Sequence, residues 1–174
     1  MGKWSNGDSR GAALVELAFA LPILIMLLVG MVSAGIAYNH QLALTHAARE
    51  GGRYGATLPT TNFSTMEEWL AEVAQQTVDD ATGTLANGVP GRYVCVAYVH
   101  PDGIGALDQT KRHEVIGSGA PIVSNVPCIS TDGRPDNERR VQVVVGRDTD
   151  FSAVFFSSTL GLDAEAINRF EASQ

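Results

Sequence analysis

The stretch LAFALPILIMLLVGMVSAGIAYN, residues 17–39, contains no formally charged side chain. As an α-helix this stretch is about 34 Å long, at 1.5 Å per residue, which exceeds the roughly 30 Å thickness of a bilayer's hydrocarbon core. A core helix of a soluble protein would be shorter and would carry a polar stripe, whereas this run has almost no polar side chain before Ser33. The stretch therefore predicts a membrane-spanning helix near the N-terminus.

The charges around this run predict its orientation. Lys3 and Arg10 precede it, whereas the residues after Tyr38 comprise 10 Lys and Arg against 17 Asp and Glu. Positive residues stay on the cytoplasmic side, so we expect a single pass through the inner (cytoplasmic) membrane, with the N-terminus inside and an acidic domain outside. An acidic domain repels phosphate backbones, which argues against a nucleic-acid partner.

The same order of positive charge, apolar run and translocated domain also describes a secretory signal peptide. Small residues at Gly35 and Ala37 would allow a signal peptidase to cut before Tyr38. The run is longer than the apolar core of an ordinary signal peptide, which favours retention in the membrane. A secreted or membrane-anchored extracellular binding module therefore remains the alternative interpretation.

A carboxylate lies where the apolar run begins. Placing Glu16 at the edge of a bilayer costs free energy, up to about 3 kcal/mol at the centre of a span, so a partner is expected. If the chain is cut after Gly11, the new amine on Ala12 lies four residues before Glu16. The two groups could then pair within one helix or between neighbouring helices. The alternative is a glutamate that extends to the lipid headgroups without a partner.

These residues also carry a resemblance to a known family. The segment RGAALVEL, residues 10–17, followed by an apolar helix that contains Pro22, resembles a prepilin-peptidase recognition segment. Residues 38–53, YNHQLALTHAAREGGR, resemble the TadE-like minor pseudopilins, accessory subunits of the tight-adherence (Tad, type IVc) pilus machinery. The resemblance covers residues 10–56, and a fainter one covers residues 164–171.

The resemblance implies a structural or assembly role in pilus biogenesis, adhesion or secretion, and no enzymatic activity. It implies cleavage between Gly11 and Ala12 by a prepilin peptidase at the cytoplasmic face, and a role for Glu16 in aligning subunits. The implied partners are that peptidase, other pilin and pseudopilin subunits, Tad assembly proteins and membrane lipid.

Three residues within the span bear on helix packing. Pro22 removes a backbone donor, so we expect a local kink that neighbouring helices cover. Gly30 and Ala34 are four residues apart, a spacing of small residues that lets a second helix approach closely.

The helix is expected to continue outside the membrane over residues 39–53. Leu42, Ala43, Ala47 and Glu50 recur at steps of three and four residues and predict its buried face. The glycines at positions 51, 52 and 55 are expected to loosen the helix before Pro59 ends it.

The remaining chain predicts an α+β domain, a helix packed on a small antiparallel sheet. Thr65 and Glu68 fit a capping box for a helix that runs to about Leu85. Strands are expected at residues 94–99, 112–116, 141–145 and 164–170, with a long loop over residues 118–136. We divide the chain into a cytoplasmic leader (1–11), a transmembrane and extended helix (12–56) and an extracytoplasmic domain (57–174).

Two cysteines, Cys95 and Cys128, lack the neighbours of a zinc site, and no metal ligand set or cofactor motif is expected. In a domain outside the cytoplasm they predict a disulfide that stabilises it by roughly 3–4 kcal/mol. Two buried free thiols are the alternative. The sequence lacks the common catalytic motifs, and Asp148 and Asp150 alone are weak evidence for an acid–base pair, so no catalytic residue is assigned.

Overall fold

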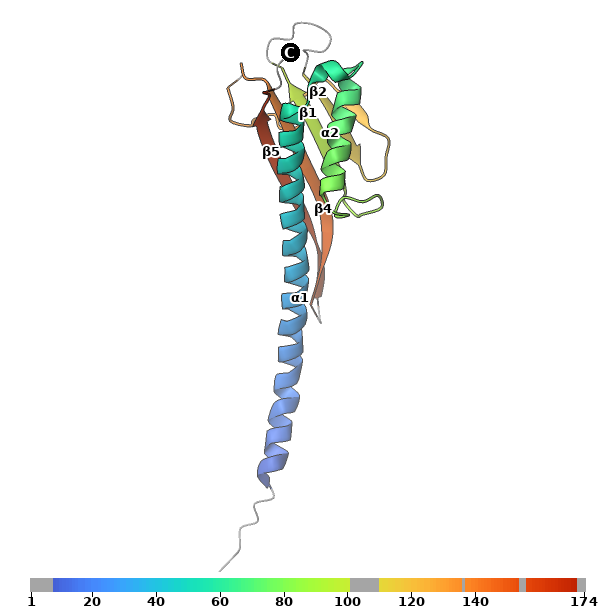
Figure 1. Ribbon diagram of the computed structural model, residues 1–174. Coiled ribbons are helices and arrows are strands. Elements are labelled where there is room, and N and C mark those ends of the chain that lie inside the picture. The colour runs from blue at the N-terminus through green and yellow to red at the C-terminus, as the bar shows by residue number, and fades with distance from the viewer. Residues whose placement is uncertain (1–7, 101–109, 136, 154–155, 172–174) are drawn as a thin grey trace, which may run out of the picture. The chain divides into compact units, whose positions relative to one another are not determined.

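Figure 1 shows the computed structural model, which describes residues 8–100, 110–135, 137–153 and 156–171. The elements in chain order are α1 (Asp8–Thr57), a 3-10 turn (Thr60–Asn62), α2 (Met66–Asp80), β1 (Tyr93–Val99), β2 (Lys111–Ile116), β3 (Ile122–Ser124), β4 (Arg140–Ala153) and β5 (Phe156–Arg169). The strands form one antiparallel sheet in the order β3-β2-β1-β4-β5. The predicted α+β class is confirmed.

The chain forms two compact units that do not coincide with whole elements. The first unit comprises Met1–Ala37 and Asp150–Thr159, and the second comprises Tyr38–Thr149 and Leu160–Gln174. The first unit therefore contains most of the apolar run, whereas the second contains α2 and most of the sheet.

In the first unit, the apolar side chains of α1 face outward. Phe19 is 75% exposed and Met31 is 68% exposed, and most of the other large apolar side chains of this segment are similar. Among the described residues, one helix, at Gly11–Thr57, is long and apolar enough to cross a membrane. The expected membrane-spanning candidate is therefore present, with an apolar surface that this chain does not cover itself.

In the second unit, α1 continues through its glycines to Thr57, so the expected loosening at Gly51 and Gly52 does not occur. The reason is close packing. A Cβ at Gly51 would clash with the hydroxyl of Thr77 on α2, and a Cβ at Gly52 would lie 2.5 Å from Asn168 Oδ1 on β5. The glycines thus let α2 and β5 approach the helix backbone.

The buried stripe of α1 differs from the predicted one. Leu44, Ala47 and Ala48 are completely buried, whereas Leu42 is 40% exposed and Glu50 is exposed. Both sets of residues recur at helical spacing, so periodicity alone could not separate them. The actual stripe consists mainly of small residues, because the helix lies close to its neighbours.

Helix α2 begins as predicted and ends earlier. The Glu68 amide donates to the Thr65 hydroxyl over 3.2 Å, and the Glu68 carboxylate accepts from the amide of Ser64 rather than that of Thr65. The helix ends at Asp80, because Thr82 and Gly83 have φ values of 47° and 85° that a right-handed helix cannot contain.

The core lies between the sheet and the two helices. Strand β1 is central, paired with β2 on one side and β4 on the other, and α2 packs against β1 and β2. The side chains of Trp69, Tyr98 and Phe170 form an edge-to-face cluster with centroids 5.1 to 6.2 Å apart. The indole of Trp69 donates to the carbonyl of Leu58 over 3.1 Å, which fixes the connection between α1 and α2.

Two parts of the sheet differ from the prediction. Strands β4 and β5 are each 14 residues long, far beyond the predicted segments 141–145 and 164–170. The segment 118–136 was expected to be a loop throughout, but it contains β3, which pairs with the edge of β2. The added parts of β4 and β5 include Gly, Asp and Ser, which have low strand propensity, so their strand conformation depends on pairing with neighbouring strands.

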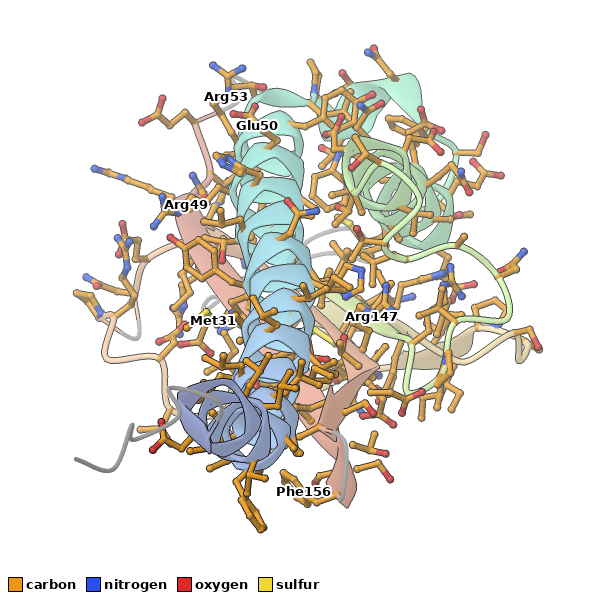
Figure 2. The ribbon with its side chains drawn as sticks, turned by 90° about the horizontal axis from the view of Figure 1, so that it is seen from below. Met31, Arg49, Glu50, Arg53, Arg147 and Phe156 are labelled. Carbon is orange, nitrogen blue, oxygen red and sulfur yellow. A yellow bond between two sulfur atoms is a disulfide. The ribbon has the colours of Figure 1, made fainter. Side chains whose placement is uncertain are left out.

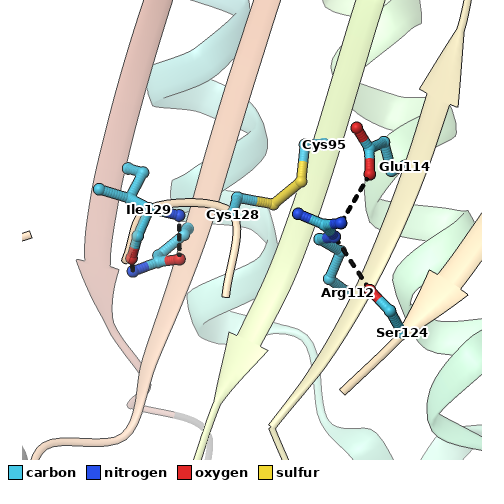
Figure 3. Close-up of a disulfide and its surroundings, with 7 residues drawn as sticks. Cys95, Arg112, Glu114, Ser124, Cys128 and Ile129 are labelled. Atoms are coloured by element: carbon cyan, nitrogen blue, oxygen red, sulfur yellow. Dashed lines mark hydrogen bonds and ion pairs between the residues drawn. A yellow bond between two sulfur atoms is a disulfide. The ribbon is translucent and has the colours of Figure 1, made fainter. Parts of the chain in front are cut away.

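The predicted disulfide between Cys95 and Cys128 is present (Figure 3), so the two cysteines are not free thiols. It attaches the segment after β3 to central strand β1. Gln142 on β4 secures the same segment, since its side chain accepts from the Ile129 amide and donates to the Ile129 carbonyl, both over 3.0 Å. Beside the disulfide, Arg112 pairs with Glu114 at 3.0 Å.

Candidate assembly and membrane-anchoring site

The predicted cleavage site lies near the start of α1. Gly11 and Ala12 are exposed helical residues, and a Cβ at Gly11 would meet no atom within 4 Å. The bond between them lies about one turn into α1, where backbone amides lack helical acceptors and helices fray readily. A peptidase could therefore reach this bond and unwind the helix around it at a low cost in free energy.

Glu16 is also exposed on α1. Within the part of the chain that the structure describes, no basic side chain forms an ion pair with its carboxylate. Ala12 and Glu16 are separated by about 6 Å along the helix axis, at 1.5 Å per residue. Among the described residues, Glu16 thus lacks the charged partner that its position in an apolar segment calls for.

The three predicted packing residues lie on the outward-facing segment of α1. The helix continues on both sides of Pro22. A Cβ at Gly30 would meet no atom within 4 Å, and Ala34, one turn further on, is exposed. Met31, which follows Gly30 in the sequence and is labelled in Figure 2, is 68% exposed. The surface is open to a lipid or to another helix.

A contact that the sequence analysis missed also involves this segment. The hydroxyl of Ser33 donates to the carbonyl of Ser152 on β4 over 2.7 Å. Nearby in the same unit, the rings of Phe151 and Phe156 lie 6.0 Å apart, and Phe156 is 56% exposed. Ser33 carries the first hydroxyl of an otherwise apolar run, and this was the one sign in the sequence that it has a hydrogen-bond partner. The partner could not be identified, because it is 119 residues away in the chain.

Asp148 and Asp150, which were weak evidence for an acid–base pair, both have structural partners. The Asp148 side chain packs against Gly91, whose φ is 62°, and the Asp148 amide donates to the Pro90 carbonyl over 2.8 Å. Asp150 accepts from the Thr159 hydroxyl over 3.4 Å. In the described ranges, no three His, Cys, Asp or Glu side chains are grouped as metal ligands would be.

Comparison with known proteins supports the resemblance in the helical region. The family model described as TadE-like protein matches residues 11–53, about a quarter of the chain. No curated protein and no solved structure matches the chain. The match begins at the predicted cleavage residue Gly11, includes Glu16, and ends where α1 packs on α2 and β5.

Proposed function

We propose, starting from the match of residues 11–53 to the TadE-like family model, that this chain is a minor pseudopilin of the tight-adherence pilus machinery. The family match indicates a protein associated with that pilus system. The finer proposal is that the chain is a non-enzymatic assembly subunit. It is anchored by residues 17–39 in the cytoplasmic membrane and carries its folded domain on the extracytoplasmic side.

The observation that supports this proposal best is the pairing of an uncovered apolar helix with an unpartnered carboxylate at its start. Most large apolar side chains between Leu14 and Met31 are more than 40% exposed, so the segment requires lipid or other helices around it. Glu16 requires an opposite charge in the same layer. A neighbouring subunit with a free amine on Ala12 would supply both the helix surface and the charge.

Two further features support the orientation. Lys3 and Arg10 favour a cytoplasmic N-terminus. The disulfide between Cys95 and Cys128 belongs to an oxidising compartment, which is outside the cytoplasm. In this proposal residues 1–11 are the leader, and Pro22, Gly30 and Ala34 belong to the helix surface that faces other pilin-like subunits.

Processing is tested by comparing two glycine substitutions in the presence of a prepilin peptidase. Gly11→Leu alters the residue before the proposed cut, and Gly35→Leu alters the residue that a signal peptidase would need. Intact-mass spectrometry of the membrane-derived protein gives the N-terminus. We expect the native chain and Gly35→Leu to begin at Ala12, and Gly11→Leu to retain its leader.

The alternative predicts the opposite pattern. A secreted module would begin at Tyr38, would be lost from the membrane fraction, and would fail to mature in Gly35→Leu while Gly11→Leu matured normally. Either a native chain that begins at Tyr38 or normal trimming of Gly11→Leu would refute processing after Gly11. Both glycines lie where a side chain meets open space, so neither substitution is expected to disturb the fold.

A further inference from the structure

A cleft of about 590 Å³ opens in the second unit beside α1. Its walls come from α1, from the turn after α2 and from β4, and include Asn39, His40, Ala43, His46, Thr84 and Arg147. Figure 2 shows Arg147 and Arg49 on opposite sides of α1, so only Arg147 of the two can serve this cleft.

Arg147 brings a positive charge that no ion pair within the described residues neutralises. Its Nε donates to the Asp148 carbonyl over 3.1 Å, and its Nη1 donates to the Thr84 carbonyl over 3.2 Å. Both acceptors are neutral, and no carboxylate in the described residues forms an ion pair with it. Partial burial lowers the pKa of the guanidinium. Since a guanidinium has five N–H donors, three remain for a ligand.

The surroundings of Arg147 strengthen the case for an anion. The Nδ1 of His40 lies 3.1 Å from the Thr149 hydroxyl. Burial and, second, the charge of Arg147 lower the pKa of His40. The chain as a whole has a net charge of −7, so this positive cleft is a local feature and not a consequence of overall composition.

The cleft also lies at a defined level on α1. The uncharged run ends at Asn39, which is the first residue of the cleft. Tyr38, which precedes it, is 66% exposed, and tyrosines at the ends of membrane spans lie among the headgroups. From Asn39 to His46 the helix rises about 10 Å, comparable with the roughly 5–8 Å thickness of one headgroup layer.

We propose that this cleft binds the phosphate group of a phospholipid from the leaflet next to the folded domain. Arg147 donates to the phosphate oxygens in the forked geometry that suits such anions. The lipid chains remain in the bilayer. The inference rests on the membrane anchoring in the proposed function, and it adds a lipid ligand that the family match does not assign.

Binding is tested with the full-length protein in a nonionic detergent, with dioleoylphosphatidylglycerol as the probe and native mass spectrometry as the readout. Arg147→Gln removes the charge. Ala43→Glu places a competing carboxylate in the cleft and retains Arg147, so it remains informative if Arg147→Gln unfolds. The matched controls are Arg49→Gln, on the other side of α1, and Ala43→Gln, which adds the bulk without the charge.

We expect Arg147→Gln and Ala43→Glu each to weaken retention of the lipid at least about tenfold, the equivalent of one charge-assisted hydrogen bond. Both controls should stay within about twofold of the native protein, and dioleoylglycerol, which lacks the phosphate, should not be retained. Undiminished affinity in both test variants would overturn the proposal. Inorganic phosphate bound as tightly as the lipid would overturn the assignment of a lipid ligand.

A separate measurement distinguishes failure of the cleft from failure of the proposed function. Alkaline carbonate should leave the native chain and Arg147→Gln in the membrane pellet, because the apolar helix, not the cleft, anchors the chain. Release of the native chain would refute membrane anchoring itself, whatever the lipid affinity in detergent.

Discussion

At the scale of single residues, Asp132 shows how one carboxylate holds the segment after β3 against the sheet. Its Oδ2 accepts from Arg140 Nε over 2.5 Å and from Gln142 Nε2 over 2.6 Å. Burial alone would raise the pKa of this carboxyl, but the hydrogen bonds from Arg140, Gln142 and the Arg134 amide outweigh it, so the pKa is lowered. The folded state therefore favours the ionised form of Asp132.

Asp132→Asn should destabilise the domain in a pH-dependent way. At pH 7 it leaves the nearly buried Arg140 without its anion, and we expect a loss of about 3 kcal/mol. Because the folded pKa is depressed, the contribution of Asp132 is present above the unfolded pKa of about 3.9 and is lost as the pH falls through the folded value. Urea unfolding at a series of pH values should thus show the native and variant curves converging below about pH 4.

Asp150→Asn is the control for this experiment. Its carboxylate is exposed, and substitution should change the free energy of unfolding by no more than about 0.5 kcal/mol. A difference between native protein and Asp132→Asn that stays constant across the pH range would contradict the assigned role.

Single residues also show what sequence reasoning can reach. The cap at Thr65 and Glu68 was predictable because both partners lie within four residues, and the Cys95–Cys128 bond because the chain has only two cysteines. Arg147 was missed, because the cleft it lines depends on Thr84, which is 63 residues away, and because no pattern in the sequence shows that its charge lacks an ion pair with the described carboxylates. Sequence patterns report local chemistry, whereas uncompensated charge is a property of the folded neighbourhood.

At the scale of elements, local pattern identified α2 and β1, but it underestimated the elements that depend on pairing. Strand β3 has three residues and exists because β2 offers an edge. The outer half of α1 continues through three glycines because α2, β4 and β5 pack onto them. The helix–helix contact at Gly51 and Thr77 is the clearest case, since Thr77 is completely buried and donates to the Val73 carbonyl over 2.7 Å.

Gly51→Ala should destabilise the domain although alanine is the better helix former. Helix propensity gains about 1 kcal/mol, but the new methyl group clashes with Thr77 and forces α1 and α2 apart, which costs roughly 1–3 kcal/mol. We expect a net loss of about 1 kcal/mol, measured by thermal unfolding of the full chain in detergent.

The double variant Gly51→Ala/Thr77→Ala tests the mechanism. Alanine removes both the Thr77 hydroxyl, which is the atom nearest to the added Cβ, and the methyl group that lies 3.2 Å from it, so the clash is relieved. The two substitutions should therefore be less destabilising together than the sum of their separate effects. Strict additivity would show that the clash at Thr77 is not the cause.

At the scale of the whole molecule, the two units have different surfaces, one acidic and one apolar. The second unit buries its apolar side chains around Trp69 and keeps an acidic exterior, which is sufficient for a folded domain in water. The helical segment of the first unit exposes its apolar side chains and keeps Glu16 near its N-terminal end. Such an apolar segment requires a bilayer or neighbouring helices around it, and the proposed role as a pilin-like subunit would supply them.

Glu16→Gln should separate membrane insertion from assembly. The amide retains the size of the side chain and removes the charge, so insertion should be unchanged or easier. Attraction between the carboxylate and the amine of a neighbouring Ala12 would be lost, a contact of about 4 kcal/mol at 4 Å with an effective dielectric constant of 20. We expect the variant to be trimmed and membrane-bound, but to co-purify with its partner subunits at least about tenfold less. Glu50→Gln applies the same chemical change to an exposed residue of α1 that pairs with Arg53 at 3.1 Å, and it should assemble normally. Equal co-purification of the two variants would show that Glu16 does not align subunits.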